Sequence, residues 1–224
     1  MTKNQILLFD LGDTLFFRNK PHIVYDAELI NRISLVPTQK AKEILLMNQT
    51  NFSGVYQFDK DNEFFRSLTA EDNYIHNFFS KVFSDLMIKG DLELFLEERK
   101  KESRYSLFPN VFNYLSQLHN YYRLGCITNG RPSRRRVLEQ FGILPFFDPT
   151  MIFISDEIGY CKPNKDLFTY VDKKISSPQK TISFFDDEQI NLDVAKNLGW
   201  RIYLVDHKNK GFEILNIFLT DLDK

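Results

Sequence analysis

The chain has few cysteines and no excess of charge of either sign. Cysteine occurs only as Cys126 and Cys161 among 224 residues, which argues against a small secreted fold held together by disulfides. The 29 lysine and arginine residues nearly balance the 30 aspartate and glutamate residues, so the formal net charge is −1. Because proteins that coat nucleic acid normally carry a basic excess, we expect no nucleic-acid partner.

Long apolar runs are missing as well. No segment approaches the roughly 20 apolar residues of a membrane-spanning helix. The first ten residues, MTKNQILLFD, hold too short an apolar stretch for a signal peptide. We therefore expect a cytoplasmic protein without a membrane partner. With 43% hydrophobic and 26% charged residues, the composition is that of a globular chain, long enough for one large domain or a domain with an insert.

Five short apolar runs have the pattern of strands buried on both faces. They are residues 6–10, 123–128, 151–155, 181–186 and 201–206. Continuous apolar runs, rather than alternation, favour a parallel sheet covered by helices on both sides. Helical patterns follow three of these strands, at 132–141, 164–174 and 189–198, and residues 212–222 suggest a closing helix or an extended edge. The repeated strand–helix–strand order predicts an α/β fold with a doubly wound parallel sheet.

A segment of roughly ninety residues without strand signals interrupts this rhythm after the first strand. Apolar residues at spacings of three and four predict an amphipathic helix that includes Ile75, Phe78, Phe79, Val82, Phe83 and Leu86. Two further helices are predicted at 25–34 and 39–47, and the apolar pattern resumes at Leu92, after Gly90. We therefore predict an α-helical cap domain at residues 18–105, inserted into an α/β core of residues 1–17 and 106–224.

Polar side chains stand at or beyond the ends of four predicted strands. They are Asp10, Thr128, Lys162, and the pair Asp186 and Asp187. Each alone is unremarkable, since aspartate at a strand end is usually a turn or helix-cap residue. In an open α/β sheet, however, ligands bind beyond the carboxyl ends of the strands. Clustered carboxylates repel one another unless a cation lies among them, and oxygen ligands favour Mg²⁺.

Four sequence segments in this order resemble those of the haloacid dehalogenase-like (HAD) hydrolase superfamily. The segments are FDLGDTL at 9–15, ITNG at 127–130, GYCKPNKDLF at 159–168 and FFDDEQINLDVAKNLG at 184–199. The resemblance covers the whole core and implies a Rossmann-like fold with a helical cap inserted after the first strand. The predicted insert resembles the family's caps only in its position and its helices, so the resemblance does not indicate which substrate is bound.

The resemblance implies a role for each matching residue around the phosphoryl group. Asp10 would be the nucleophile that forms an aspartyl-phosphate. Thr128 and the backbone amide of Asn129 would bind the transferring phosphoryl group. Lys162 would pair with Asp10 and the phosphate, and would offset negative charge as it builds.

The cofactor that the resemblance implies is Mg²⁺. Its ligands would be Asp10, the backbone carbonyl of Gly12, Asp187, and Asp186 directly or through water. Asn191 matches a position that supports the acidic segment, although an ordinary helix-cap role is equally compatible with it. The four histidines show no metal-ligand spacing of their own; they are His22, His76, His119 and His207.

The sequence departs from the family pattern at Gly12. Most phosphatases of the family have an aspartate two residues after the nucleophile, as general acid and then base. Here that position is glycine, and Asp13 stands one residue further along. A shift of one residue redirects a side chain substantially. Whether Asp13 takes over the catalytic role therefore stays open.

Three interpretations of function remain. The leading one is a Mg²⁺-dependent phosphomonoester hydrolase that acts on a small phosphorylated metabolite and works as a monomer or homodimer. A haloacid dehalogenase would use the same Asp10 without a metal, but dehalogenases usually lack the acidic pair. A catalytically weak protein or pseudo-enzyme that binds phosphorylated ligands is the third, because the fold alone does not exclude it.

Overall fold

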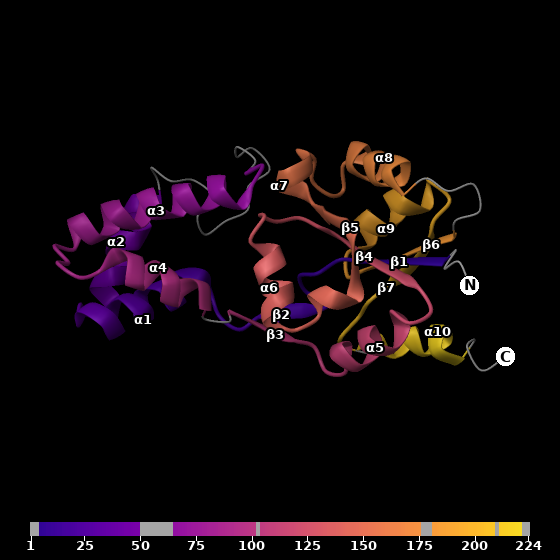
Figure 1. The fold of residues 1–224 in the computed structure, drawn as a ribbon, viewed down its shortest axis with the longest axis horizontal. Helices are drawn as coiled ribbons and strands as arrows, with labels where there is room; N and C mark the ends of the chain where they lie inside the picture. Colours follow the sequence, from indigo (N-terminus) through magenta and orange to yellow (C-terminus); the bar gives the residue numbers. More distant parts are fainter. Residues whose placement is uncertain (1–4, 50–64, 102–103, 176–180, 209–210, 221–224) are drawn as a thin grey trace. The chain divides into compact units, whose positions relative to one another are not determined.

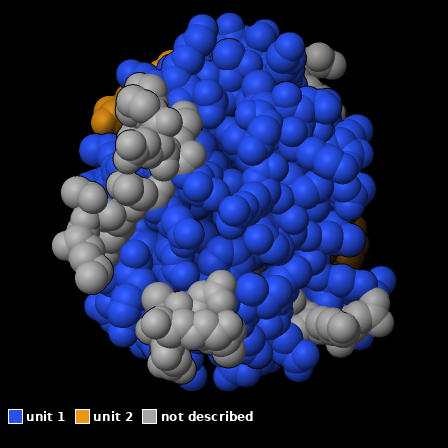
Figure 2. Space-filling view, turned by 90° about the vertical axis from the view of Figure 1, so that its right-hand side faces the viewer, with its two compact units in different colours: residues 1–17, 106–224 blue, residues 18–105 orange. Residues whose placement is uncertain are grey.

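The computed structural model describes residues 5–49, 65–101, 104–175, 181–208 and 211–220 (Figure 1). The chain divides into two compact units, coloured separately in Figure 2. One, called the core unit below, comprises Met1–Phe17 and Ser106–Lys224, and the other, called the insert, comprises Arg18–Tyr105. In the described part of the chain, no helix has the length and apolar character needed to cross a membrane.

A five-stranded parallel sheet lies at the centre of the core unit, in the order β5-β4-β1-β6-β7. The strands are β1 (Gln5–Phe9), β4 (Arg123–Thr128), β5 (Phe147–Ile154), β6 (Thr181–Asp186) and β7 (Arg201–Leu204). The central strand β1 pairs with β4 and β6, so Phe9 is in register with both Cys126 and Phe185. The predicted α/β fold with a parallel sheet is confirmed.

Helices cover both faces of this sheet, as the alternation of neighbouring side chains on β6 shows (Figure 1). Phe184 packs edge-on against Phe168 and Trp200, beside α8 (Lys165–Lys174) and α9 (Gln189–Lys196). Phe185 packs on the opposite face against Phe218 of α10 (Asn216–Thr220). These two apolar layers explain why the strands are continuous apolar runs rather than alternating ones.

The remaining elements of the core unit are shorter. They are α5 (Val111–Leu118), α6 (Arg134–Gln140), α7 (Ser155–Ile158), and 3-10 helices at Leu144–Phe146 and Gly211–Leu215. Helix α5 was not predicted. Strand β5 begins four residues earlier than predicted, because hydrogen bonding to β4 continues through polar residues that break its apolar run. The predicted closing segment is a 3-10 turn followed by a short helix.

Two short strands form a separate two-stranded sheet where the chain passes between the units. They are β2 (Phe16–Arg18) and β3 (Tyr105–Leu107). The helical segment predicted at residues 18–105 begins and ends in these strands, neither of which was predicted from the sequence. Three-residue strands are too short to produce a readable alternation, so their pairing is decided by the tertiary structure.

The insert contains four described helices. They are α1 (His22–Ser34), α2 (Thr38–Gln49), α3 (Leu68–Asp85) and α4 (Leu92–Lys101). The predicted apolar stripe of α3 is buried, and it packs with residues of the other three helices in one cluster that includes Ile30, Leu45, Phe79, Val82 and Phe95. Ser67 caps α3, since its side chain accepts a hydrogen bond from the amide of Ala70. The insert therefore has a hydrophobic core of its own.

Candidate active site

The candidate site lies at the carboxyl ends of the three central strands of the sheet. Asp10 follows β1, Thr128 ends β4 and Asp186 ends β6, and all three residues are buried. The Asp10 amide donates a hydrogen bond to the carbonyl of Phe185, 2.8 Å away, which continues the β1–β6 pairing by one residue. Parallel pairing in register thus brings side chains distant in sequence to one edge.

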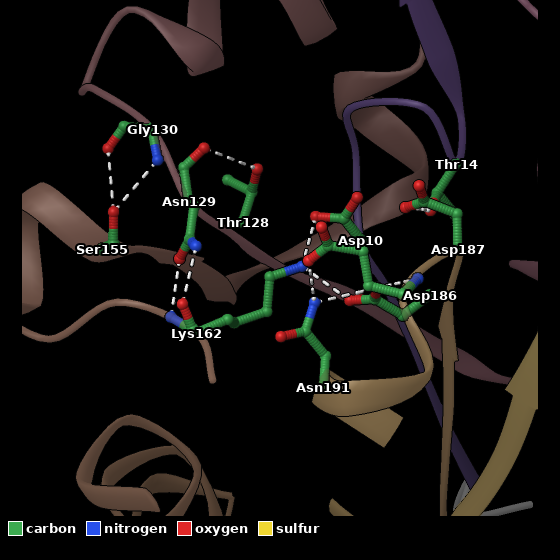
Figure 3. Close-up of polar contacts among 11 residues, drawn as sticks. Asp10, Thr14, Thr128, Asn129, Gly130, Ser155, Lys162, Asp186, Asp187 and Asn191 are labelled. Carbon is green, nitrogen blue, oxygen red and sulfur yellow. Dashed lines mark hydrogen bonds and ion pairs between the residues drawn. The ribbon is translucent and has the colours of Figure 1, made fainter. Parts of the chain in front are cut away.

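The side chain of Lys162 bridges two of these carboxylates (Figure 3). Its Nζ donates to Asp10 Oδ1 and to Asp186 Oδ2, at 2.6 Å in each case. Lys162 is itself buried, so the ammonium and both carboxylates are largely removed from water. One positive charge shared between two negative ones leaves the buried cluster with an excess of negative charge.

Burial and the neighbouring charges together shift the pKa values of the cluster. Burial raises the pKa of the Asp10 carboxyl, and the charge of Asp186 adds to the effect against the opposing influence of Lys162. Burial would lower the pKa of Lys162, but the two carboxylates outweigh it and raise that pKa, so the side chain stays an ammonium. The pKa of Asp187 is also raised, by burial first and then by Asp186. A further cation at this edge would therefore be stabilised.

Asn129 ties the loop after β4 to the segment that carries Lys162. Its Oδ1 accepts from the backbone amide of Lys162 at 2.7 Å, and its Nδ2 donates to the Lys162 carbonyl at 2.9 Å. Ser155, at the start of α7, holds the same loop because its hydroxyl contacts both the amide and the carbonyl of Gly130. Sequence reasoning expected the Asn129 amide to contact phosphate, and it missed both the side-chain contacts of Asn129 and the role of Ser155.

The two aspartates at the end of β6 have different surroundings. Asp186 Oδ1 accepts from the Glu188 amide at 2.8 Å and from Asn191 Nδ2 at 3.0 Å, while its Oδ2 accepts from Lys162. Asn191 also donates to Glu188 Oε2 at 2.9 Å, so it braces the acidic segment rather than only capping a helix. Donors thus contact both oxygens of Asp186, which orients it toward Lys162.

Asp187 is held by a residue that sequence reasoning did not select. The hydroxyl of buried Thr14 donates to Asp187 Oδ1 at 3.1 Å, and the Thr14 carbonyl lies 2.8 Å from Nε2 of His207. Thr14 stands within the segment FDLGDTL, so its position was available as a signal. His207 follows the last strand and belongs to none of the four family-like segments, so no local pattern pointed to it.

Gly12 and Asp13 form the turn between Asp10 and Thr14. The Asp13 amide donates to the Phe16 carbonyl at 2.7 Å, and Asp13 adopts the left-handed conformation with φ of 58°. Its side chain is exposed, whereas Asp10 is buried. The structure therefore does not bring the Asp13 carboxylate into the cluster around Lys162.

The oxygen atoms at this edge fit Mg²⁺. Within the described ranges, no three side chains of histidine, cysteine, aspartate or glutamate gather closely enough to hold a metal by themselves. Mg²⁺ does not need such a cage, because it binds through one or two carboxylates and keeps waters and phosphate oxygens in its other positions. Asp10, Asp187 and the Gly12 carbonyl are hard oxygen donors of this kind, in surroundings with excess negative charge.

Comparison with known proteins gives consistent matches along the chain. The family described as haloacid dehalogenase-like hydrolase matches residues 7–205. YfnB of Bacillus subtilis is 24% identical over 184 residues, which are 78% of this chain and 72% of that protein. The pyrimidine 5′-nucleotidase YjjG of Escherichia coli is 32% identical, but only over 74 residues, or 33% of this chain and 32% of that protein.

Solved structures show the same fold. The structure of YfnB bound to magnesium superposes with a TM-score of 0.56 at 20% identity, covering 98% of this chain and 100% of that one. A HAD family enzyme from Bacteroides thetaiotaomicron gives a TM-score of 0.61 at 16% identity, covering 96% and 98% of the two chains. A HAD phosphatase from Thermococcus onnurineus gives 0.54 at 19% identity, covering 93% and 90%.

Proposed function

This chain belongs to the haloacid dehalogenase-like hydrolase family, and from that premise we propose that it is a Mg²⁺-dependent phosphomonoester hydrolase acting on a small phosphorylated metabolite. The observation that carries the proposal is the contact of Lys162 with both Asp10 and Asp186. This contact joins two carboxylates and a buried positive charge at the edge of the sheet where α/β proteins bind ligands, and it supports a role for Asp10 as nucleophile.

Asp10 is the nucleophile in this mechanism. One of its carboxylate oxygens forms a bond to phosphorus while the bond from phosphorus to the ester oxygen breaks, and the departing alkoxide takes a proton from water to become the alcohol. Water then attacks the aspartyl-phosphate, which restores the Asp10 carboxylate and releases inorganic phosphate. The Lys162 ammonium offsets the negative charge on the phosphoryl oxygens, and Thr128 with the Asn129 amide binds them.

Asp10, the Gly12 carbonyl and Asp187 would hold the metal, with Asp186 contributing directly or through water. When bound, Mg²⁺ supplies positive charge that reduces the repulsion between Asp10 and an anionic substrate. The magnesium in the YfnB structure supports this assignment, as does the raised pKa of Asp187. The nucleotidase activity of YjjG makes a nucleoside monophosphate one reasonable substrate, beside sugar phosphates.

A catalytically weak protein that binds phosphorylated ligands is the second candidate. Gly12 favours it, because no carboxylate stands there to move protons and Asp13 is exposed. A haloacid dehalogenase is less well supported. That chemistry uses the same nucleophile but gives no reason for the second acidic residue, Asp187, and the Thr14 contact that holds it.

One panel of assays tests these alternatives. The purified protein is given nucleoside monophosphates, sugar phosphates, p-nitrophenyl phosphate and 2-chloropropionate, each with Mg²⁺ and with excess chelator. We expect phosphate release that needs Mg²⁺ and stops with chelator. Asp10→Asn should lower the rate by at least about 10³-fold, since it removes the nucleophile. Asp187→Asn should raise the Mg²⁺ concentration needed for half-maximal activity.

The matched control is Asp193→Asn, which makes the same change at an exposed aspartate of α9. It should behave as the wild type does. Activity that survives excess chelator would remove the metal from the proposal, and activity that survives in Asp10→Asn would remove the covalent mechanism. Halide release without phosphate release would identify a dehalogenase instead.

A further inference from the structure

His207 contacts the turn that follows the nucleophile. It stands just beyond β7, and its Nε2 lies 2.8 Å from the carbonyl oxygen of Thr14. A carbonyl oxygen only accepts hydrogen bonds, so Nε2 must carry a proton and donate it. Thr14, whose carbonyl accepts this hydrogen bond, also donates a hydrogen bond from its hydroxyl to Asp187 at 3.1 Å. His207 is therefore two hydrogen bonds away from a proposed metal ligand.

The ring of His207 is fixed by a flat stack on Phe108. The two ring centroids are 3.4 Å apart, and the planes differ by 6°. Phe108 itself packs against Phe17, with centroids 4.9 Å apart, and its amide donates to the carbonyl of Leu15 at 3.0 Å. The imidazole thus has a defined orientation, and the carbonyls of two adjacent turn residues, Thr14 and Leu15, are contacted by His207 and by the amide of Phe108.

The backbone geometry of this turn is unusual. Within residues 11–16, Gly12 has the conformational freedom of a glycine, and Asp13 adopts the left-handed conformation, which is uncommon for a residue with a side chain. Inside the turn, the amides of Leu15 and Phe16 donate to the carbonyl of Leu11 at 2.8 and 3.1 Å. A contact from outside the turn, at Thr14, restricts the residue whose side chain reaches Asp187.

We propose that His207 is a positioning residue: by donating to the Thr14 carbonyl, it holds the turn of residues 11–16 so that the Thr14 hydroxyl keeps Asp187 oriented toward the metal. The consequence for Mg²⁺ rests on the proposed function, whereas the effect on the turn does not. His207 touches neither substrate nor metal in this scheme. Its effect passes through Thr14, as contacts behind a metal ligand commonly do.

Two variants separate the donor from the stack. His207→Phe keeps a flat ring that can lie on Phe108 but has no N–H to donate. His207→Gln keeps an N–H donor and gives up the aromatic stack. The matched control is His76→Phe in the insert, where the imidazole contacts Glu93 at 2.9 Å and both side chains are exposed to solvent in large part. Thermal melting of each variant establishes that it is folded before the other measurements are made.

The first measurement is amide hydrogen exchange in metal-free protein. Loss of one hydrogen bond should speed exchange at the Leu15 and Phe16 amides of His207→Phe by about 2- to 10-fold. His207→Gln should lie closer to the wild type, and His76→Phe should match it. Unchanged exchange at these amides in His207→Phe would overturn the inference, whether or not the protein is an enzyme.

The second measurement is the Mg²⁺ dissociation constant from calorimetry, with Mg²⁺ alone as the probe. His207→Phe should bind about 10-fold more weakly, with His207→Gln partly restoring the affinity. If the turn loosens while Mg²⁺ affinity stays the same, His207 does not position Asp187 and the inference is wrong. If the wild-type protein binds no Mg²⁺, the proposed metal site fails, and the exchange measurement alone decides whether His207 holds the turn.

Discussion

Position 12 is where a single residue most affects the chemistry that this site can perform. A glycine stands there, two residues after Asp10, and the nearest alternative carboxylate, Asp13, is exposed. A Cβ atom built on Gly12 would meet no other atom within 4 Å, and the backbone at Gly12 is outside the left-handed region. The turn therefore has room for an aspartate side chain without the strain that replacing a left-handed glycine would bring.

We predict that Gly12→Asp speeds the hydrolysis of alkyl phosphates more than that of aryl phosphates. An alkoxide leaving group needs a proton, whereas p-nitrophenolate needs little help, and a positioned general acid is worth on the order of 10²-fold or more. The check is kcat/KM for a sugar phosphate and for p-nitrophenyl phosphate in the variant and the wild type.

Asp13→Asn is the companion variant for this prediction. Because Asp13 is exposed, we expect it to change neither rate by more than about 2-fold, within the range of a remote surface charge. A selective loss of alkyl phosphate hydrolysis in Asp13→Asn, with no gain in Gly12→Asp, would show that Asp13 already supplies the proton.

A buried charge network joins α1, α4 and the end of the insert just before and at the start of β3. Asp26 of α1 is fully buried and accepts hydrogen bonds from Arg99 of α4 at 2.9 Å and from Arg104, just before β3, at 2.6 Å. Arg104 Nη1 lies 3.2 Å from His22 Nδ1, and His22 Nε2 lies 3.0 Å from the hydroxyl of Tyr105. Since a guanidinium can only donate, His22 Nδ1 must be an unprotonated acceptor.

The pKa values of the two titrating groups in this network are both lowered, for different physical reasons. Burial lowers the pKa of His22 to about 2, and the charges of Arg104 and Arg18 contribute further. For Asp26, burial would raise the pKa, but the two arginines outweigh it and lower that pKa. Both groups therefore make the folded protein less stable on acidification. His22 does so as pH falls below its unfolded pKa near 6.5, and Asp26 only as pH falls below about 4.

We predict that the free energy of unfolding falls between about pH 6.5 and pH 5 because of His22. In this window the unfolded chain takes up a proton at His22 that the folded insert does not, which costs on the order of 2 kcal/mol at pH 5. His22→Asn, which does not titrate and still offers an acceptor to Arg104, should flatten the pH dependence. Urea unfolding at about pH 7 and pH 5 measures the difference.

The control for this prediction is His76→Asn, since His76 is partly exposed on α3 and pairs with Glu93. It should keep the wild-type pH dependence. An equal loss of stability in His22→Asn and in the wild type would show that His22 is not the group responsible.

At the scale of the whole molecule, the chain passes twice between its two units. The two passages lie in β2 and β3, which are paired with each other. The hydrophobic clusters of the core unit and the insert are separate. Two units that are joined by two adjacent segments can change their relative position by small rotations in those segments.

We predict that these segments respond when the site is filled. Beryllium fluoride, as a phosphate mimic, together with Mg²⁺ should slow hydrogen exchange at residues 17–20 and 105–109. Asp10→Asn, which lacks the carboxylate that the mimic would bond to, should show no such change. Equal exchange in the wild-type protein with and without the mimic would argue that the insert does not move in response to ligand.

Much of this protein could be predicted from the sequence, because the relevant signals are local. Continuous apolar runs gave the five core strands, and the bounds of β4 and β6 agree with those predicted. The spacing of Phe78, Phe79 and Val82 revealed the buried stripe of α3. Four short segments identified the HAD family. Asp10 and Asp186 could be predicted to be neighbours because both stand at the carboxyl ends of predicted parallel strands.

Other features were decided only by the tertiary structure. That Lys162 bridges Asp10 and Asp186, and that the Asn129 side chain binds the backbone of Lys162, depends on how loops from different strands meet. The contact of His207 with Thr14 joins residues far apart in sequence, through one backbone carbonyl that every residue possesses. No pattern of side chains encodes such a contact, because strand register and packing determine which distant groups come within hydrogen-bonding distance.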